Sequence, residues 1–289
     1  MIRVPVWVES RENDSDTAPL AAKNIRATLD GHSAPIVVVR GPGDDLMLLI
    51  VLDLTGDLSL VEPAKKALQE EIGKLPPNAF AGLLRAQDGP RVLADPTPDR
   101  HALAEQIENL PVSGKAGLLD TVDVTEGIAD SILIKSTVRV AVLYVTDSDI
   151  RNYREDFINP VINSSDTHDL SRRFPDALIQ EKISKLSAGL SSRQTPLFIV
   201  HLQYSSEQLN EAYQNGLKQL AEVTGGSSSF CQSTAEIPAA IQRIFALILS
   251  QYSVTLALPE RAGKSVQVEL QAGDNRPLNY RTRFVLKGR

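Results

Sequence analysis

Along most of this chain, segments with the apolar pattern of β-strands alternate with segments that have the apolar spacing of α-helices. A continuous apolar run from Leu46 to Asp53 is typical of a β-strand covered on both faces. Apolar residues then recur at helical spacing from Leu58 to Leu75 and stop at the pair Pro76-Pro77. The alternation continues to about residue 250. It predicts an α/β fold, with a doubly wound, mostly parallel sheet that carries helices on both faces.

The remaining elements of this α/β region follow from the same two patterns. Further strands are predicted at 80–86, 91–95, 138–147, 195–203 and 228–231, and further helices at 99–109, 118–132, 177–190, 206–223 and 235–250. A long polar connection, residues 148–175, follows the strand that ends at Asp147. Loops of this length are usually functional or disordered, so this segment is either a binding loop or a mobile insertion.

Both ends of the chain show the two-residue period of β-strands. Strands are predicted at 2–9 and 36–40, with a brief helix and a strand between them, and again at 253–258, 265–271 and 280–287. Neither end has enough strands to bury a sheet face alone, so we expect the two ends to pack together as one small β-sandwich. The predicted division is an N-terminal β segment (1–45), an α/β domain (46–250) and a C-terminal β segment (251–289).

Composition and charge narrow the classes of partner. The 289 residues carry a net charge of −6, and no run of Lys and Arg forms a nucleic-acid or anionic-membrane footprint. The longest apolar stretch is too short to span a bilayer, and the start MIRVPVWVES lacks the pattern of a signal peptide. The single cysteine, Cys231, cannot form a disulfide within the chain, and we expect it to be buried and structural.

Candidate chemistry gathers where two buried strands end. The segments DLTGD (53–57) and TDSD (146–149) place Asp53 and Asp147 at strand ends, and the carboxyl ends of parallel strands share the edge where ligands bind. The loop SGKAG (113–117) is expected beside them. The predicted binding residues are Asp53, Thr55, Asp57, Lys115, Asp147 and Asp149. Hard oxygen ligands from several loops suit Mg²⁺ or Ca²⁺.

Residues 46–250 resemble a von Willebrand factor type A domain. That family carries a metal-ion-dependent adhesion site built from a DxSxS motif after the first strand, a threonine in a later loop, and an aspartate after the fourth strand. Here DLTGD takes the place of the first motif, GKAGLLD that of the threonine loop, and VLYVTDSD supplies the last aspartate. The resemblance implies a metal site formed by Asp53, Thr55, Asp57 and Asp147.

Because of two departures from the family pattern, the sequence does not decide whether a metal ion binds. Asp57 replaces a serine and adds a third negative charge, and Ala116 stands where the family has its threonine. One alternative is a bound Mg²⁺ or Ca²⁺. The other is a metal-free cluster in which Lys115 and backbone N–H groups compensate the carboxylates, because clustered carboxylates otherwise repel one another. In that case we expect Asp53 to accept hydrogen bonds from backbone N–H groups of its own loop and to lie within reach of Lys115 or Ser148.

The resemblance implies a non-enzymatic protein-binding module, an adhesion or scaffold domain that binds another protein through the carboxyl edge of its sheet. Residues 220–254 also resemble a bacterial subgroup with a strand-rich tail, which implies an extracytoplasmic location, secreted or periplasmic. Two alternatives stay open: a structural domain with an inactive metal site that binds through another surface, and a metal-dependent hydrolase that uses Asp53 and Asp147. The four histidines show no metal-ligand spacing, and no Ser-His-Asp arrangement is evident.

Overall fold

The computed structural model describes residues 1–9, 19–153, 175–259 and 263–286. Its central six-stranded sheet has the strand order β10-β9-β8-β5-β6-β7. The strands are β5 (Leu46–Asp53), β6 (Ala79–Arg85), β7 (Arg91–Thr97), β8 (Arg139–Thr146), β9 (Leu197–His201) and β10 (Ser228–Phe230). All pairings are parallel except that of β6 with β7. The mostly parallel sheet predicted from the sequence is confirmed.

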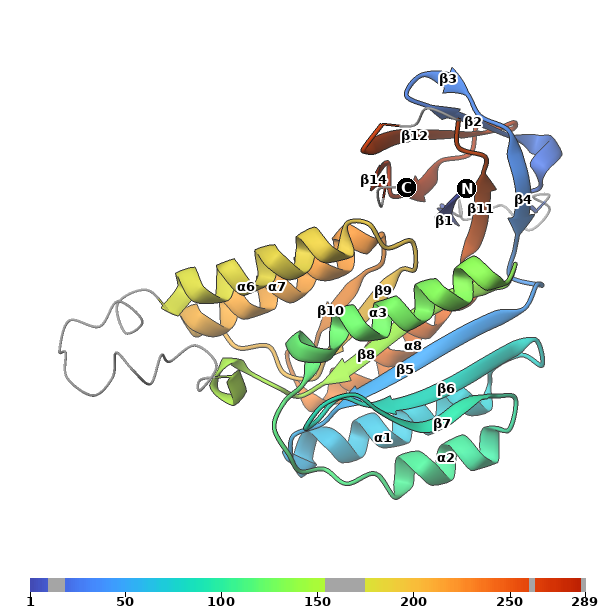
Figure 1. The fold of residues 1–289 in the computed structure, drawn as a ribbon. Coiled ribbons are helices and arrows are strands. Elements are labelled where there is room, and N and C mark those ends of the chain that lie inside the picture. Colours follow the sequence, from blue (N-terminus) through green and yellow to red (C-terminus); the bar gives the residue numbers. More distant parts are fainter. Residues whose placement is uncertain (10–18, 154–174, 260–262, 287–289) are drawn as a thin grey trace.

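Helices cover both faces of this sheet (Figure 1). They are α1 (Leu58–Gly73), α2 (Arg100–Glu108), α3 (Leu118–Lys135), α6 (Pro175–Leu190), α7 (Gln208–Thr224) and α8 (Ile237–Ser250), with the short helices η1 (Ala22–Asn24), η2 (Ile150–Tyr153) and η3 (Thr234–Glu236). One apolar core joins the sheet to α1, α2 and α8, and a second joins it to α3, α6 and α7. Strand β5 serves both cores, since Ile50 and Leu52 belong to the first and Leu49 and Val51 to the second. Its unbroken apolar run therefore reflects cover on two faces.

The two chain ends form a β-sandwich of two four-stranded sheets, with strand orders β13-β1-β11-β4 and β14-β12-β2-β3. Its strands are β1 (Ile2–Val8), β2 (Ile25–Leu29), β3 (His32–Ser33), β4 (Ile36–Arg40), β11 (Tyr252–Leu256), β12 (Ser265–Ala272), β13 (Leu278–Tyr280) and β14 (Arg283–Val285). Strand β1 pairs with β11, and β2 pairs with β12, so each sheet combines both ends of the chain. The expected packing of the ends on each other is confirmed. The exact division at residues 45 and 251 stays a prediction.

One predicted strand is different in the structure. Residues 280–287 were expected to form a single strand, but β13 and β14 belong to different sheets of the sandwich. Strand β13 pairs with β1, while β14 pairs with β12. The chain changes sheets between them, at Arg281 and Thr282, which alternation of apolar residues does not reveal.

Among the described residues, no helix has the length and apolar character needed to cross a membrane.

Candidate functional site

Asp53 ends β5 and is fully buried. Its carboxylate accepts hydrogen bonds from the backbone N–H groups of Gly117 (2.8 Å) and Leu118 (3.2 Å), and from the hydroxyl of Thr146 (3.2 Å). Gly117 is the residue before the first turn of α3 and has no capping side chain of its own. The carboxylate of Asp53 therefore caps α3 from a neighbouring strand, where the positive end of the helix dipole favours an anion.

The environment of Asp53 acts on its charge in two directions. Burial raises the pKa of this carboxyl to about 6, because the charged form loses its hydration. The hydrogen bonds from Gly117, Leu118, Ser148 and Thr146 oppose that rise, because they stabilise the carboxylate. We expected backbone donors from the loop of Asp53 itself. The donors come instead from the start of α3, while Ser148 lies within reach as expected.

Asp147 follows β8 and binds the loop after β5. Its Oδ1 accepts from the backbone N–H (2.6 Å) and the hydroxyl (3.0 Å) of Thr55. Its Oδ2 accepts from the backbone N–H groups of Gly56 and Asp57, each at 3.3 Å. Successive N–H groups that converge on one carboxylate form an anion-binding concavity. The TGD segment is thus folded around the side chain of Asp147.

Asp57 is the N-cap residue of α1, and its side chain hydrogen-bonds to the start of that helix rather than to Asp53 or Asp147. It precedes α1, and its Oδ1 accepts from the backbone N–H (3.0 Å) and the hydroxyl (2.6 Å) of Ser59. This is the ordinary N-cap interaction of a helix. The side chain of Asp57, which the family pattern would make a serine ligand, is therefore engaged by its own helix. Leu58 beside it is 58% exposed.

The loop 113–117 is fixed against the turn that follows β6. Asp88 donates its backbone N–H to the carbonyl of Lys115 (3.0 Å), and its Oδ1 accepts from the N–H of Lys115 (2.8 Å). A Cβ atom at Gly117 would lie 1.9 Å from the carbonyl oxygen of Ala86, so only glycine permits this approach. Ala116 is buried in the apolar core of the α3 face. Asp88 was not predicted from the sequence, where its segment DGP indicates only a turn.

A chain of buried hydroxyl groups lies below these loops. Ser148 Oγ is 2.6 Å from Thr146 Oγ1 and 3.1 Å from the hydroxyl of Tyr213 on α7. The hydroxyl of Tyr153 on η2 accepts from the N–H of Leu119 at 3.3 Å. These contacts join β8, η2, α3 and α7 under the edge of the sheet. Thr146 lies beside Asp53 in the register of the parallel strands β5 and β8, so its contact with Asp53 could be expected once those strands are paired. Nothing in the sequence indicates that Tyr153 and Tyr213 belong to this group.

Two further predicted binding residues are Lys115 and Asp149. Lys115 is exposed and Asp149 is half-buried, both at this edge. The counter-ion role of the Lys115 side chain stays a prediction. The long connection 148–175 was predicted to be either a binding loop or a mobile insertion, and its residues 154–174 lie outside the described residues. Cys231 is buried, as predicted, and burial raises the pKa of its thiol to about 11.

The geometry bears on whether these residues fit a divalent cation. Asp53 and Asp147 use both carboxylate oxygens to accept N–H or O–H groups, Asp57 caps α1, and Ala116 offers no side-chain oxygen. Across the described ranges, no three His, Cys, Asp or Glu side chains are grouped so that they could hold a metal ion. In this arrangement the described residues do not form a ready-made site for Mg²⁺ or Ca²⁺. Uptake of either ion by Asp53, Thr55, Asp57 and Asp147 stays a prediction that only a binding measurement tests.

Comparison with known proteins gives likenesses of structure. No model of a protein family matches the sequence, and no curated protein matches it either. A D319A mutant of the PilB minor pilin from Streptococcus sanguinis has a TM-score of 0.52 at 12% identity, with 72% of this chain and 62% of that chain covered. The von Willebrand factor domain of the type V pili tip protein Mfa5 from Porphyromonas gingivalis has a TM-score of 0.48 at 15% identity, with 71% and 95% covered.

A von Willebrand factor type A protein from Catenulispora acidiphila covers 93% of this chain, and 71% of its own chain is matched, at 12% identity and a TM-score of 0.48. At such identities the likeness concerns the fold. The strand order, the helices on both faces and the aspartates at the ends of β5 and β8 agree with the resemblance found in the sequence. The α/β core of this chain has a von Willebrand factor type A-like fold.

Proposed function

We propose that this chain is a non-enzymatic protein-binding module, and that it binds through the loops at the carboxyl edge of the central sheet. These binding loops are 54–57, 113–117 and 147–153. The observation that carries the proposal is the way in which Asp53, Asp147 and Asp88 hold them: each carboxylate accepts backbone N–H groups from a loop distant in sequence. Loops fixed in advance lose little conformational freedom when a partner binds.

The proposed surface is presented in one conformation without a cation. In the family site, as the sequence resemblance implies, a metal ion would recruit a carboxylate from the partner. Here the anion-binding groups of the loop already hold Asp147, so we propose that the partner makes direct contacts. Leu58 supplies an exposed apolar group beside the charged Asp57, and Lys115 lies exposed on the neighbouring loop. An apolar contact with charged neighbours is a usual composition for a protein interface.

The fold gives some support to a protein-binding function and to a location outside the cytoplasm. Two of the structural neighbours named above are a minor pilin and the tip protein of a pilus. We propose by analogy that this chain also acts outside the cytoplasm, in adhesion or as a scaffold. Fold analogy is a weaker support than the geometry of the loops, because one fold carries many functions.

Photo-crosslinking in cells that produce the protein tests the proposal. A photoreactive amino acid is placed at Leu58 or at Lys115, and at Val37, which is 55% exposed on the β-sandwich, as the matched control. We expect a protein partner to be trapped from positions 58 and 115 and not from position 37, with the same yield when a chelator is present. Trapping from position 37 alone would favour the alternative that the β-sandwich is the binding surface.

Two further results would contradict the proposal. If no position traps a protein, the binding loops are not an interface in the cell. If the purified chain hydrolyses generic ester or phosphate substrates, and Asp53→Asn abolishes the turnover, the hydrolase alternative replaces the binding module.

A further inference from the structure

Helices α3, α6 and α8 of the α/β core end close to the β-sandwich, on the side of the sheet opposite the binding loops (Figure 1). The last carbonyl groups of a helix lack partners within the helix and carry the negative end of its dipole. Helices α3, α6 and α8 all present such groups here. Three arginines, Arg3, Arg139 and Arg281, donate to them or to the residues that follow, and we call this set the arginine joint.

Arg281 reaches from the sandwich to the segment after α6. Its Nη1 donates to the carbonyl of Arg193 at 2.9 Å, and its Nη2 donates to the carbonyl of Ser191. The same guanidinium stacks on the ring of Phe284, with 4.4 Å between Cζ and the ring centroid. Burial lowers the pKa of Arg281 to about 10, which still leaves it charged at neutral pH.

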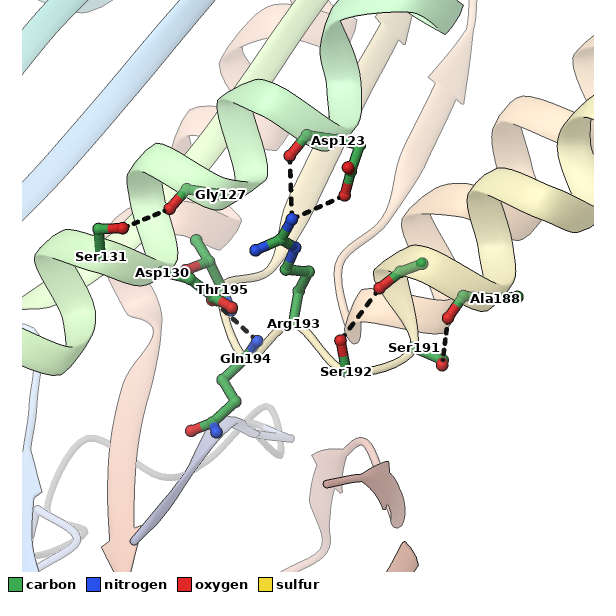
Figure 2. A network of polar contacts seen from close by, with 11 residues as sticks. Asp123, Gly127, Asp130, Ser131, Ala188, Ser191, Ser192, Arg193, Gln194 and Thr195 are labelled. Atoms are coloured by element: carbon green, nitrogen blue, oxygen red, sulfur yellow. Dashed lines mark hydrogen bonds and ion pairs between the residues drawn. The ribbon is translucent and has the colours of Figure 1, made fainter. Parts of the chain in front are cut away.

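The segment that receives Arg281 is itself held on α3 (Figure 2). Asp130 Oδ1 accepts from the N–H groups of Gln194 (3.0 Å) and Thr195 (3.2 Å), and Arg193 Nη2 donates to Asp123 at 2.8 Å. A contact between the sandwich and this segment therefore acts on α3 and α6 together.

Arg3, on β1 of the sandwich, adds a second connection to the same region. Its backbone N–H donates to Gln194 Oε1 at 2.8 Å, and its Nη2 donates to the carbonyl of Ser136, the residue that ends α3.

Arg139 connects the two places where the chain passes between the core and the sandwich. It begins β8 and is fully buried. Its Nη1 donates to the carbonyls of Leu249 (3.1 Å) and Gln251 (3.0 Å), at the passage from α8 to β11. Its Nη2 donates to the carbonyls of Pro42 (3.0 Å) and Asp44 (2.8 Å), at the passage from β4 to β5. One planar side chain thus binds both passages.

We propose that the arginine joint holds the β-sandwich and the α/β core as one rigid body, and so fixes the direction in which the binding loops face relative to the two chain ends. This inference is independent of the proposed function. The groups that accept from Arg3, Arg139 and Arg281 in this joint are carbonyl and amide oxygens rather than carboxylates. The joint should therefore keep its strength in high salt, which screens exposed ion pairs.

Trp7 provides a reporter at this interface. It is the single tryptophan of the chain, lies on β1, and contacts the core through a bond from its Nε1 to the carbonyl of Leu247 (2.8 Å) and an edge contact with Phe198. Urea unfolding of the full chain is followed by Trp7 fluorescence and by the helical circular dichroism of the core, in low and high salt. For the wild type, we expect the two signals to change in one coincident transition in both salts.

Arg281→Met is the test variant, and Arg26→Met, an exposed arginine on β2, is its matched control. We expect Arg281→Met to move the Trp7 transition to lower urea than the helical transition, and Arg26→Met to leave both unchanged. Separate transitions in the wild type would overturn the proposal, and so would coincident, unshifted transitions in Arg281→Met.

Arg139→Lys gives a second readout, because lysine keeps the charge but loses the planar fork. We expect faster protease cleavage at residues 41–45 and 249–251 than in the wild type, with the helical signal retained. Cleavage at the wild-type rate would show that Arg139 does not hold the two passages.

Discussion

At both edges of the central sheet, charged side chains bind backbone groups, but the charges at the two edges have opposite signs. At the carboxyl edge, the carboxylates of Asp53 and Asp147 accept backbone N–H groups from the start of α3 and from the loop before α1. At the amino edge, the guanidinium groups of Arg139 and Arg281 donate to backbone carbonyls at or just after the ends of α8 and α6, and Arg139 also donates to carbonyls of the passage from β4 to β5. In both places a buried or half-buried charge is paired with main-chain groups instead of an opposite charge.

The contrast teaches how helix polarity organises a doubly wound fold. A helix that follows a parallel strand runs back across the sheet, so its free N–H groups lie at the carboxyl edge and its free carbonyl groups at the amino edge. Helix α2 follows the antiparallel strand β7 and runs in the opposite sense. Anions suit the first edge and cations the second. Backbone donors at the carboxyl edge therefore offset part of the cost of burying a carboxylate there, as the hydrogen bonds to Asp53 do.

The largest expected effect lies at the amino edge. Arg139→Met leaves four carbonyls at the two chain passages without their donor, and a buried polar group that loses its partner costs about 1–3 kcal/mol. We expect the free energy of unfolding in urea to fall by at least about 3 kcal/mol. Arg26→Met on the exposed face of β2 should stay within about 0.5 kcal/mol of the wild type. If Arg139→Met and Arg26→Met lowered the free energy of unfolding equally, the role given to Arg139 at the amino edge would be wrong.

At the carboxyl edge, titration of Asp53 should make the free energy of unfolding depend on pH. Because the pKa of Asp53 is raised from 3.8 to about 6 by burial, the folded chain binds this proton more tightly than the unfolded chain does. The contribution of Asp53 to stability should be largest near pH 4 or below, fall as the pH rises toward 6, and change little above. The rise in pKa corresponds to about 3 kcal/mol at most.

Glu126 on α3 must be removed from that measurement, since burial and the nearby Asp130 raise its pKa in the same direction. Urea unfolding between pH 4 and 8 is therefore compared for Glu126→Gln and for Glu126→Gln with Asp53→Asn. We expect the fall in stability to be smaller in the double variant. The same fall in both would show that Asp53 titrates normally.

Removing the cap of α3 should have an intermediate effect. Asp53→Ala leaves the N–H groups of Gly117 and Leu118 without an acceptor, for an expected cost of about 2 kcal/mol. Asp53→Asn keeps one acceptor oxygen and should cost less at pH 7. Thermal and urea unfolding of both variants, with hydrogen exchange of the Gly117 and Leu118 amides, gives the order. An alanine variant as stable as the asparagine variant would contradict the capping role.

The smallest mutational effect is expected at Lys115. Its side chain is exposed, whereas its backbone N–H and carbonyl hold the loop through Asp88. We expect Lys115→Met to change the free energy of unfolding by no more than about 0.5 kcal/mol at pH 7. A loss of several times that size, relieved at acid pH, would instead support the counter-ion role suggested by the sequence.

Much of this architecture could be predicted from residue patterns, for physical reasons. The strand β5 is recognisable because both of its faces are apolar, and the sandwich follows because neither chain end can bury a sheet face alone. The position of Asp53 and Asp147 at one edge follows from parallel strands. Their partners could not be predicted, since the donation from Gly117 depends on how the 113–117 loop crosses β6.

The amino edge gave almost no signal in the sequence. Arg139 precedes an apolar strand and looks like an ordinary exposed flanking charge, yet it is fully buried. Its four acceptors are main-chain carbonyls, which every sequence has in every position. Side-chain patterns therefore reveal carboxylate clusters more readily than they reveal contacts with the backbone.

We infer that backbone N–H groups, and not a cation, hold the carboxylates of the carboxyl edge. Isothermal titration calorimetry with Mg²⁺ and with Ca²⁺, together with thermal unfolding of the same chelator-treated protein with and without each ion, tests it most directly. The account predicts no saturable heat of binding and an unchanged melting temperature. A saturable site with a higher melting temperature in either ion, both lost in Asp147→Ala, would contradict it.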